Sequence, residues 1–274
     1  VSMHQKVLEI DGNFGVMVPE NMVSFYVGNG KIELGEMSRL NVACPVTLDN
    51  VRVNTINEDS TYYFAGLITQ GQPRVALRNV HFRRGIYGVL AENYFYPHNK
   101  PSLEQCTFED MITGVRVDGG GIDMSYVSAG NNSVNLDARG INTDCVFEEV
   151  YLSVCRENMV TGSSSGVLNW YKGSIYRNNF DGIFVRGITF KPKCLKIYDN
   201  PRFGIFNRGL GHVSMSALSD AGYNEINRNG VGIYNHSYQG DLNGYGIGNG
   251  LGIDLTAGYN DFSGNYNGAL DMIL

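Results

Sequence analysis

The chain has 274 residues, 43% of them hydrophobic, and a formal net charge of −6 at pH 7. This length and composition allow a large buried core, and no apolar stretch approaches the length of a membrane span. A nucleic-acid-binding surface needs clustered Lys and Arg, so the acidic balance argues against nucleic acid as a partner. The first residues also lack the basic-then-apolar pattern of a secretion signal.

The first 74 residues are predicted to form the N-terminal coils of a single domain spanning residues 1–274, and residues 75–274 carry a repeat. In each copy, an apolar or aromatic anchor is followed six or seven positions later by a small residue and then by an aliphatic one. The anchors are Phe82, Phe108, Phe147, Tyr176, Ile197, Ile226 and Phe262. The small residues are Gly88, Gly114, Ser153, Gly182, Gly204, Gly232 and Gly268, followed by Val89, Val115, Val154, Ile183, Ile205, Ile233 and Ala269. Irregular spacings of 21 to 39 residues indicate a solenoid with loops of variable length.

Each repeat unit reads as two short strands joined by a tight turn. Phe108 and its neighbours alternate with polar residues, as do Val115 and Val117 around Arg116, and no long 3.6-residue period is present. The turns are rich in residues that tolerate the left-handed conformation, among them Asn178, Asn179, Asp199, Asn200, Asn227, Asn229, Gly230, Gly264 and Asn265. Stacked coil on coil, these asparagines are expected to hydrogen-bond as a ladder.

At this point the sequence resembles the right-handed parallel β-helix superfamily, which includes pectate-lyase-like proteins and bacteriophage tailspikes. The resemblance covers roughly Val75 to the C-terminus, and the segment from Val18 to Ile32 is similar to the first coils of that superfamily. It implies an all-β, single-stranded parallel β-helix of roughly ten coils. The likeness to tailspikes further implies a homotrimer. Repeat residues build a rod whatever its function, so the resemblance predicts architecture rather than chemistry.

The five cysteines are an odd number, so at least one is unpaired within the chain. Cys106 and Cys145 stand two residues before anchor phenylalanines, which points them inward as reduced core residues. Spacing of the metal-ligating kind is absent. We therefore expect folding in a reducing cytoplasm, followed by a place in a virion or outside the cell.

Three stretches interrupt the repeat. The first is the aromatic loop from Glu92 to His98. The second runs from Gly119 to Gly140 and is either a loop or a poorly matching extra coil. The third runs from Gly240 to Gly252 and alternates glycine with other residues. A dinucleotide-binding site would require a helix after these glycines, and the repeat offers none. A turning loop is therefore the plainer interpretation.

Counting ten residues from each anchor, with one insertion, gives a series of charged positions just beyond the second strand. The series is Glu92, Asp118, Glu157, Arg186, Arg208 and His236. If the register holds, these side chains form one row along the rod, about 4.8 Å apart from coil to coil. The alternative is that the end of this strand faces solvent and simply favours charge.

The three acidic members of the row, Glu92, Asp118 and Glu157, are the candidate catalytic residues. Glycoside hydrolysis uses two carboxylates, about 5 Å apart for retention and roughly 6.5 to 9.5 Å apart for inversion. The pectate-lyase resemblance implies instead that carboxylates bind Ca²⁺ while an arginine abstracts a proton. No cofactor is otherwise predicted.

Aromatic rings near the breaks add candidate sugar contacts, because they can stack on a sugar while keeping a polar edge in water. These are Tyr94, Tyr96, Trp170 and Tyr171. Together with Arg186, Arg208 and His236, the residues Tyr94, Tyr96 and Trp170 make up the predicted substrate-binding set. Core or interface packing is the alternative for each ring.

Family motifs for polysaccharide cleavage are incomplete. The segment Asn142 to Asp144 resembles the first acidic motif of polygalacturonases, but the paired aspartates that follow it in that family are missing. His212 is followed by Val213 where that family has a glycine, so Asp144 is predicted to be a turn residue.

Three functional hypotheses follow. The first is a β-helix of the tailspike type that recognises a bacterial surface polysaccharide, with or without depolymerising it. The second is a structural or adhesive rod without catalysis. The third is a secreted pectate-lyase-like enzyme, which the reduced cysteines and the missing signal disfavour.

Overall fold

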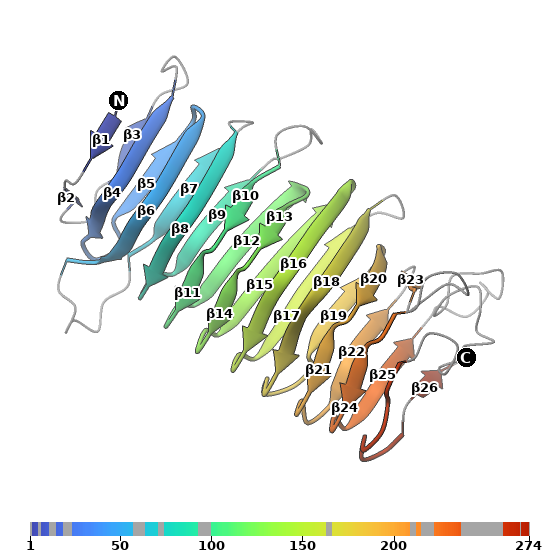
Figure 1. The fold of residues 1–274 in the computed structure, drawn as a ribbon. Coiled ribbons are helices and arrows are strands. Elements are labelled where there is room, and N and C mark those ends of the chain that lie inside the picture. The colour runs from blue at the N-terminus through green and yellow to red at the C-terminus, as the bar shows by residue number, and fades with distance from the viewer. Residues whose placement is uncertain are drawn as a thin grey trace.

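The computed structural model describes residues 2–4, 7–10, 15–18, 24–56, 64–70, 74–92, 100–162, 166–208, 212–214, 222–236, 260–268 and 270–273. These residues form strands and turns, with no helix among them. No helix of the described part is therefore long and apolar enough to cross a membrane. The strands stack along one axis into a rod, with β1 at one end and β26 at the other (Figure 1).

Two parallel sheets make up the rod, and successive coils of the chain add strands to each in turn. Sheet A contains β1 (Ser2–His4), β2 (Val7–Ile10), β4 (Phe25–Leu34), β6 (Val46–Thr55), β8 (Val75–Arg83), β10 (Ser102–Glu104), β11 (Thr107–Glu109), β13 (Asp123–Ser125), β14 (Ser128–Gly130), β16 (Asp144–Ser153), β18 (Val167–Tyr176), β20 (Thr189–Lys193), β21 (Lys196–Tyr198), β23 (His212–Val213) and β24 (Glu225–Asn227). Sheet B contains β3 (Gly15–Val18), β5 (Arg39–Val42), β7 (Gly66–Gln70), β9 (Tyr87–Glu92), β12 (Thr113–Gly120), β15 (Val134–Ile141), β17 (Glu157–Gly162), β19 (Ile183–Arg186), β22 (Phe203–Arg208), β25 (Val231–His236) and β26 (Leu270–Ile273). The predicted all-β parallel β-helix is confirmed.

Two columns of residues at positive φ shape the corners of each coil. The first column bends sheet A midway and comprises Asn29, Asn50, Asn79, Gln105, Tyr126, Glu149, Lys172, Cys194 and Tyr223. The second column turns the chain from sheet A towards sheet B and comprises Arg84, Asp110, Asn131, Val154, Arg177, Asp199 and Arg228. Single residues in this conformation redirect a strand without a long loop.

An asparagine ladder follows the second column inside the rod. The backbone N–H of Asn178 donates to Oδ1 of Asn200 at 3.1 Å, and the N–H of Asn200 donates to Oδ1 of Asn229 at 3.1 Å. The N–H of Asn229 donates in turn to Oδ1 of Asn265 at 2.9 Å. The predicted ladder is confirmed, and it satisfies backbone donors that the tight corner would otherwise bury without partners.

The core runs the length of the rod between the sheets and consists of inward-facing aliphatic and aromatic side chains. Phe82 pairs with Phe108 in register, and their rings stack with centroids 5.0 Å apart. Val89 and Val115 are paired on sheet B and buried, as predicted. Each coil thus covers the apolar face of the next.

The stretch from Gly119 to Gly140 contains an extra coil. Strands β13, β14 and β15 are inserted between their neighbours in both sheets. Ala129 occupies the anchor position of this coil, because it pairs with Phe108 on one side and Leu152 on the other. Because Ala129 is small, the repeat pattern, which was defined by large anchor residues, did not detect this coil.

The predicted placements of Phe147, Val154 and Tyr176 are wrong. Phe147 is buried but pairs with Met124 in the first half of sheet A, so it does not stack in the column of Phe108. Val154 lies at the corner with φ of 50° and 45% of its surface exposed, outside the predicted stack. Tyr176 stacks on Tyr198 on the outer face. Sheet A has two inward-facing columns of apolar residues in each coil. The sequence pattern can therefore assign a residue of one column to the other.

Cys106 and Cys145 are buried in the core, which confirms the prediction for both. Burial raises the pKa of the Cys106 thiol to about 12 and that of Cys145 to about 11. Cys44 and Cys155 are also buried, whereas Cys194 is exposed, and all five thiols are free. The four buried thiols are core residues rather than reactive groups.

Candidate binding surface on sheet B

The outer face of sheet B carries the predicted row of charges, except that Glu157 is not part of it. Asp118 pairs with Glu92 on one side and with Arg139 on the other. Farther along the rod, Arg186 pairs with Arg208, and Arg208 pairs with His236. In a parallel sheet paired positions lie about 4.8 Å apart, so the side chains of Asp118 and Arg139 share a face, as do those of Arg186, Arg208 and His236.

Glu157 does not belong to this row. It pairs with Val134 at the start of β17, whereas Thr161, at the end of that strand, pairs with Arg186. The extra coil between Asp118 and Glu157 also separates them along the rod. The prediction of Asp118 and Glu157 as a catalytic pair is therefore wrong in its geometry.

Asp118 belongs to a compensated cluster of four charged residues. Arg116 Nε donates to Asp118 Oδ2 at 3.1 Å and lies 4.0 Å from Asp137 Oδ2. Arg139 donates from Nε and Nη2 to the two oxygens of Asp137, both at 2.8 Å. This hydrogen bond to Asp137 raises the pKa of Arg139. Both arginines are held by fixed partners, so the cluster is rigid and close to neutral.

An aromatic row lies on the same face towards the C-terminal coils. Phe184 pairs with Phe206, which pairs with Tyr234, and all three side chains are half-buried on the outer face. The ring centroids of Phe184 and Phe206 are 5.1 Å apart, and those of Phe206 and Tyr234 are 5.4 Å apart. Phe203 extends the group by stacking on Tyr234 at 4.4 Å. The aromatic row (Phe184, Phe206 and Tyr234) runs beside the cationic row (Arg186, Arg208 and His236).

Arg202 borders the aromatic row on its other side. Its guanidinium lies 5.2 Å from the ring centre of Phe203 and 5.8 Å from that of Phe206. Asp181, whose side chain is fully buried, holds it through two hydrogen bonds, one from Nε at 2.8 Å, and this contact raises the pKa of Arg202. Glu157 adds a favourable charge interaction with Arg202. The rings therefore lie between cations on both sides.

Trp170 was predicted to bind substrate, and the structure places it in the core. Its side chain has no exposed surface and packs edge to face against Phe147 at 5.1 Å and Phe190 at 6.3 Å. A sugar cannot stack on a ring without exposed surface, so we correct this assignment. Tyr171, the next residue, is 42% exposed on the outer face of sheet A.

Three candidates cannot be placed. Tyr94 and Tyr96 lie outside the described residues, as does the loop from Gly240 to Gly252, and only the backbone of Glu92 is described.

Within the described part, no group of three or more His, Cys, Asp or Glu side chains could hold a metal ion. Asp144 begins a strand at an exposed position, away from the charged cluster of sheet B.

The fold defines the class of the protein as a parallel β-helix. Among solved structures, a crystal structure of a point mutant of the periplasmic alginate epimerase AlgG superposes with a TM-score of 0.62 at 12% identity, covering 96% of this chain and 75% of that chain. Two further AlgG structures match with TM-scores of 0.45 and 0.47 at 12% and 13% identity, covering 100% and 97% of this chain and 77% and 78% of theirs. No protein-family model and no curated protein matches the sequence. The similarity shows the fold, and the likeness to tailspikes stays a prediction.

Proposed function

We propose that this protein binds an acidic polysaccharide along the outer face of sheet B. The observation that carries the proposal is the aromatic row beside the cationic row, both in register over β19, β22 and β25. Rings offer a flat surface on which sugars stack, and cations on successive coils pair with carboxylates of successive sugar units. The matched fold of an enzyme named for alginate supports a polysaccharide ligand.

Charge decides the ligand class within this proposal. Arg186 and Arg208 are both exposed, and among the described residues neither forms an ion pair. Like charges on neighbouring strands repel each other. A neutral glycan would leave that repulsion in place, whereas a uronate-containing chain relieves it.

The test is a binding panel with alginate, polygalacturonate and neutral dextran. The acidic polymers are expected to bind and dextran is not. Changing Arg186→Gln together with Arg208→Gln should weaken binding about tenfold, because two exposed ion pairs contribute about 0.2–1 kcal/mol each and 1.4 kcal/mol corresponds to tenfold. Isothermal titration calorimetry at two salt concentrations measures both the loss and its screening.

The matched control changes the same charge on the other sheet. Lys191→Gln with Lys196→Gln removes two exposed cations from the outer face of sheet A and should leave this affinity unchanged. Equal losses in both variants would mean that only net charge matters. A complete absence of binding to all three polymers would favour the structural rod.

The same panel reports chemistry at Asp118, whose backbone position pairs with that of Glu92. New reducing ends indicate hydrolysis, an unsaturated ultraviolet-absorbing product indicates elimination, and an altered uronate configuration indicates epimerisation. Retention of an unchanged polymer indicates a binding module. Any turnover that persists in Asp118→Asn excludes this carboxylate from the reaction.

A further inference from the structure

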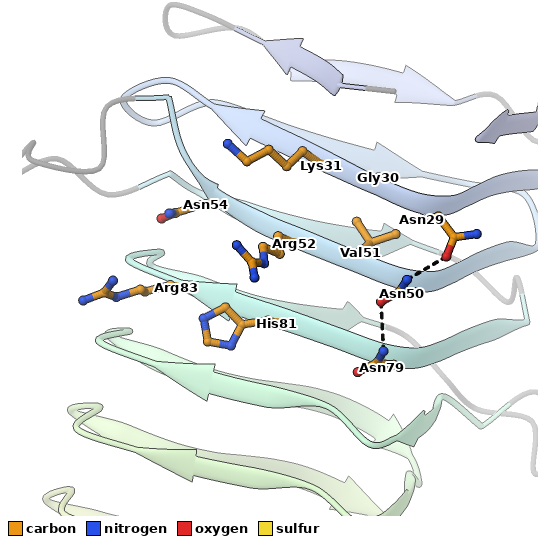
Figure 2. Close-up of a pocket in the computed structure, with 10 residues that line it drawn as sticks. All are labelled: Asn29, Gly30, Lys31, Asn50, Val51, Arg52, Asn54, Asn79, His81 and Arg83. Carbon is orange, nitrogen blue, oxygen red and sulfur yellow. Dashed lines mark hydrogen bonds between the residues drawn. The ribbon is translucent and has the colours of Figure 1, made fainter. Parts of the chain in front are cut away.

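A polar groove of about 500 Å³ lies on the outer face of sheet A, over strands β4, β6 and β8. It is formed by the N-terminal coils, whereas the aromatic and cationic rows of sheet B lie on the C-terminal coils. Figure 2 shows the basic side chains and Asn54 along one side of the groove and Asn29, Asn50 and Asn79 along the other. Its described lining includes no Phe, Tyr or Trp.

Two cations and a histidine follow one another in strict register along the groove. Lys31 pairs with Arg52, and Arg52 pairs with His81, so one such group is added per coil. Arg83 lies two residues after His81 on the same outer face. The sequence pattern missed this row because its members are 21 and 29 residues apart and most of it precedes the recognisable repeat.

The counter-charges of the groove are incomplete. Lys31 Nζ lies 2.8 Å from Glu33 Oε1, and Arg83 Nε lies 3.1 Å from Asp110 Oδ2. In the described part of the chain, Arg52 in the middle of the row forms no ion pair. Cations opposite each other on neighbouring strands are unfavourable, and an anion lying across them would relieve this repulsion.

The opposite side of the groove is a fixed row of amides. Asn50 Nδ2 donates to Asn29 Oδ1 at 2.6 Å, and Asn79 Nδ2 donates to Asn50 Oδ1 at 2.9 Å (Figure 2). All three residues have positive φ and are exposed. Each amide nitrogen carries two hydrogens, and the ladder uses one of Asn50 and one of Asn79, so the second hydrogen of each can meet a hydroxyl of a ligand.

We propose that this groove is a second binding site, which takes a carboxylate-bearing oligosaccharide lying along the rod axis. The planar fork of Arg52 and Arg83 matches a carboxylate, and the amides opposite match sugar hydroxyls. A single-stranded nucleic acid is disfavoured, because such ligands are held mainly by stacking on large aromatic rings and the described lining has no Phe, Tyr or Trp. The site does not depend on the function proposed for sheet B.

The experiment uses a tetrasaccharide of galacturonic acid as the probe, measured by calorimetry. The background is the full chain with Arg186→Gln and Arg208→Gln, in which the sheet B surface is weakened. We expect this background to retain one site, and adding Arg52→Gln with Arg83→Gln to weaken that site about tenfold. Lys191→Gln with Lys196→Gln in the same background is the charge-matched control and should have no effect.

The outcomes separate the two sites. Binding that is lost completely in the background protein overturns the groove proposal while leaving the sheet B proposal intact. Affinity that is unchanged by Arg52→Gln with Arg83→Gln also overturns it, provided circular dichroism and the urea midpoint show a folded chain. If that pair of changes prevents folding, Lys31→Gln gives the same test. Tighter groove binding of inorganic phosphate or of an oligothymidylate overturns the ligand class.

Discussion

His81 lies in register between Arg52 on β6 and Thr107 on β11, and its Nδ1 is hydrogen-bonded to the Thr107 hydroxyl. Its pKa is lowered from 6.5, chiefly by burial and further by the charges of Arg52 and Arg83, while Glu109 on β11 acts in the opposite direction. The imidazole is therefore more easily protonated in the unfolded chain than in the rod.

This shift has a defined sign. Because the unfolded state binds the proton first, His81 should lower stability as the pH falls below 6.5, and should have no effect well above that value. The urea midpoint of the wild type should fall more steeply between pH 7 and pH 5 than that of His81→Gln. Parallel curves for the two proteins would contradict the assignment. An acidic ligand in the groove should oppose the effect, because it favours the protonated ring.

Phe108 illustrates what a single core position contributes. Its ring is fully buried and stacks on Phe82, and it fits closely over Gly88, where an added Cβ would lie 2.5 Å from the ring. Phe108→Ala should destabilise the rod by about 3–5 kcal/mol, because a cavity replaces the ring. Urea unfolding measures the change. Tyr266→Ala is the control, since that ring is 78% exposed and should contribute little.

At the scale of the element, the asparagine ladder is the feature that joins one corner to the next. Asn200 accepts a hydrogen bond from the backbone of Asn178 and donates from Nδ2 to Asn229 Oδ1 at 2.9 Å. Asn200→Ala should cost about 1–3 kcal/mol for each buried group that loses its partner. The exposed neighbour Asn179→Ala should be nearly neutral in the same unfolding experiment. Equal stabilities would show that water replaces the ladder.

The strands and their turns could largely be predicted from the sequence, because period-2 alternation and the asparagine turns recur in most coils. The register could not be predicted throughout. Ala129 in the anchor position conceals a coil, and Phe147 in the other inward column imitates an anchor. Because of these two errors, Glu157 was predicted at a position of the row that Thr161 occupies in the structure.

The candidate sites could also be predicted only in part. Arg186, Arg208 and His236 stand in register as expected, although their role in binding stays a prediction. The aromatic row was missed, since alternation alone does not say which of two apolar rows faces outward. The groove was missed because Lys31, Arg52 and His81 come together only when coils of unequal length are stacked.

On the scale of the whole molecule, the rod displays two candidate surfaces on different sheets and in different coils. The groove lies over β4, β6 and β8, and the rows of sheet B lie over β19, β22 and β25. These two groups of strands lie towards opposite ends of the rod (Figure 1). A long polymer engaged by both would gain from effective concentration, since the second contact becomes intramolecular. Short oligosaccharides would bind each surface separately.

The columns of positive-φ residues also bear on how such a rod comes into being. Holding a residue such as Val154 or Lys172 in this conformation costs about 1–2 kcal/mol, and each coil has up to two such corners. An isolated coil therefore has this strain and no neighbouring coil to pair with. A coil that adds to a folded one forms a ladder of hydrogen bonds and covers an apolar face in the same step. Assembly then resembles the growth of a one-dimensional crystal, with a slow nucleus of a few coils and rapid addition afterwards.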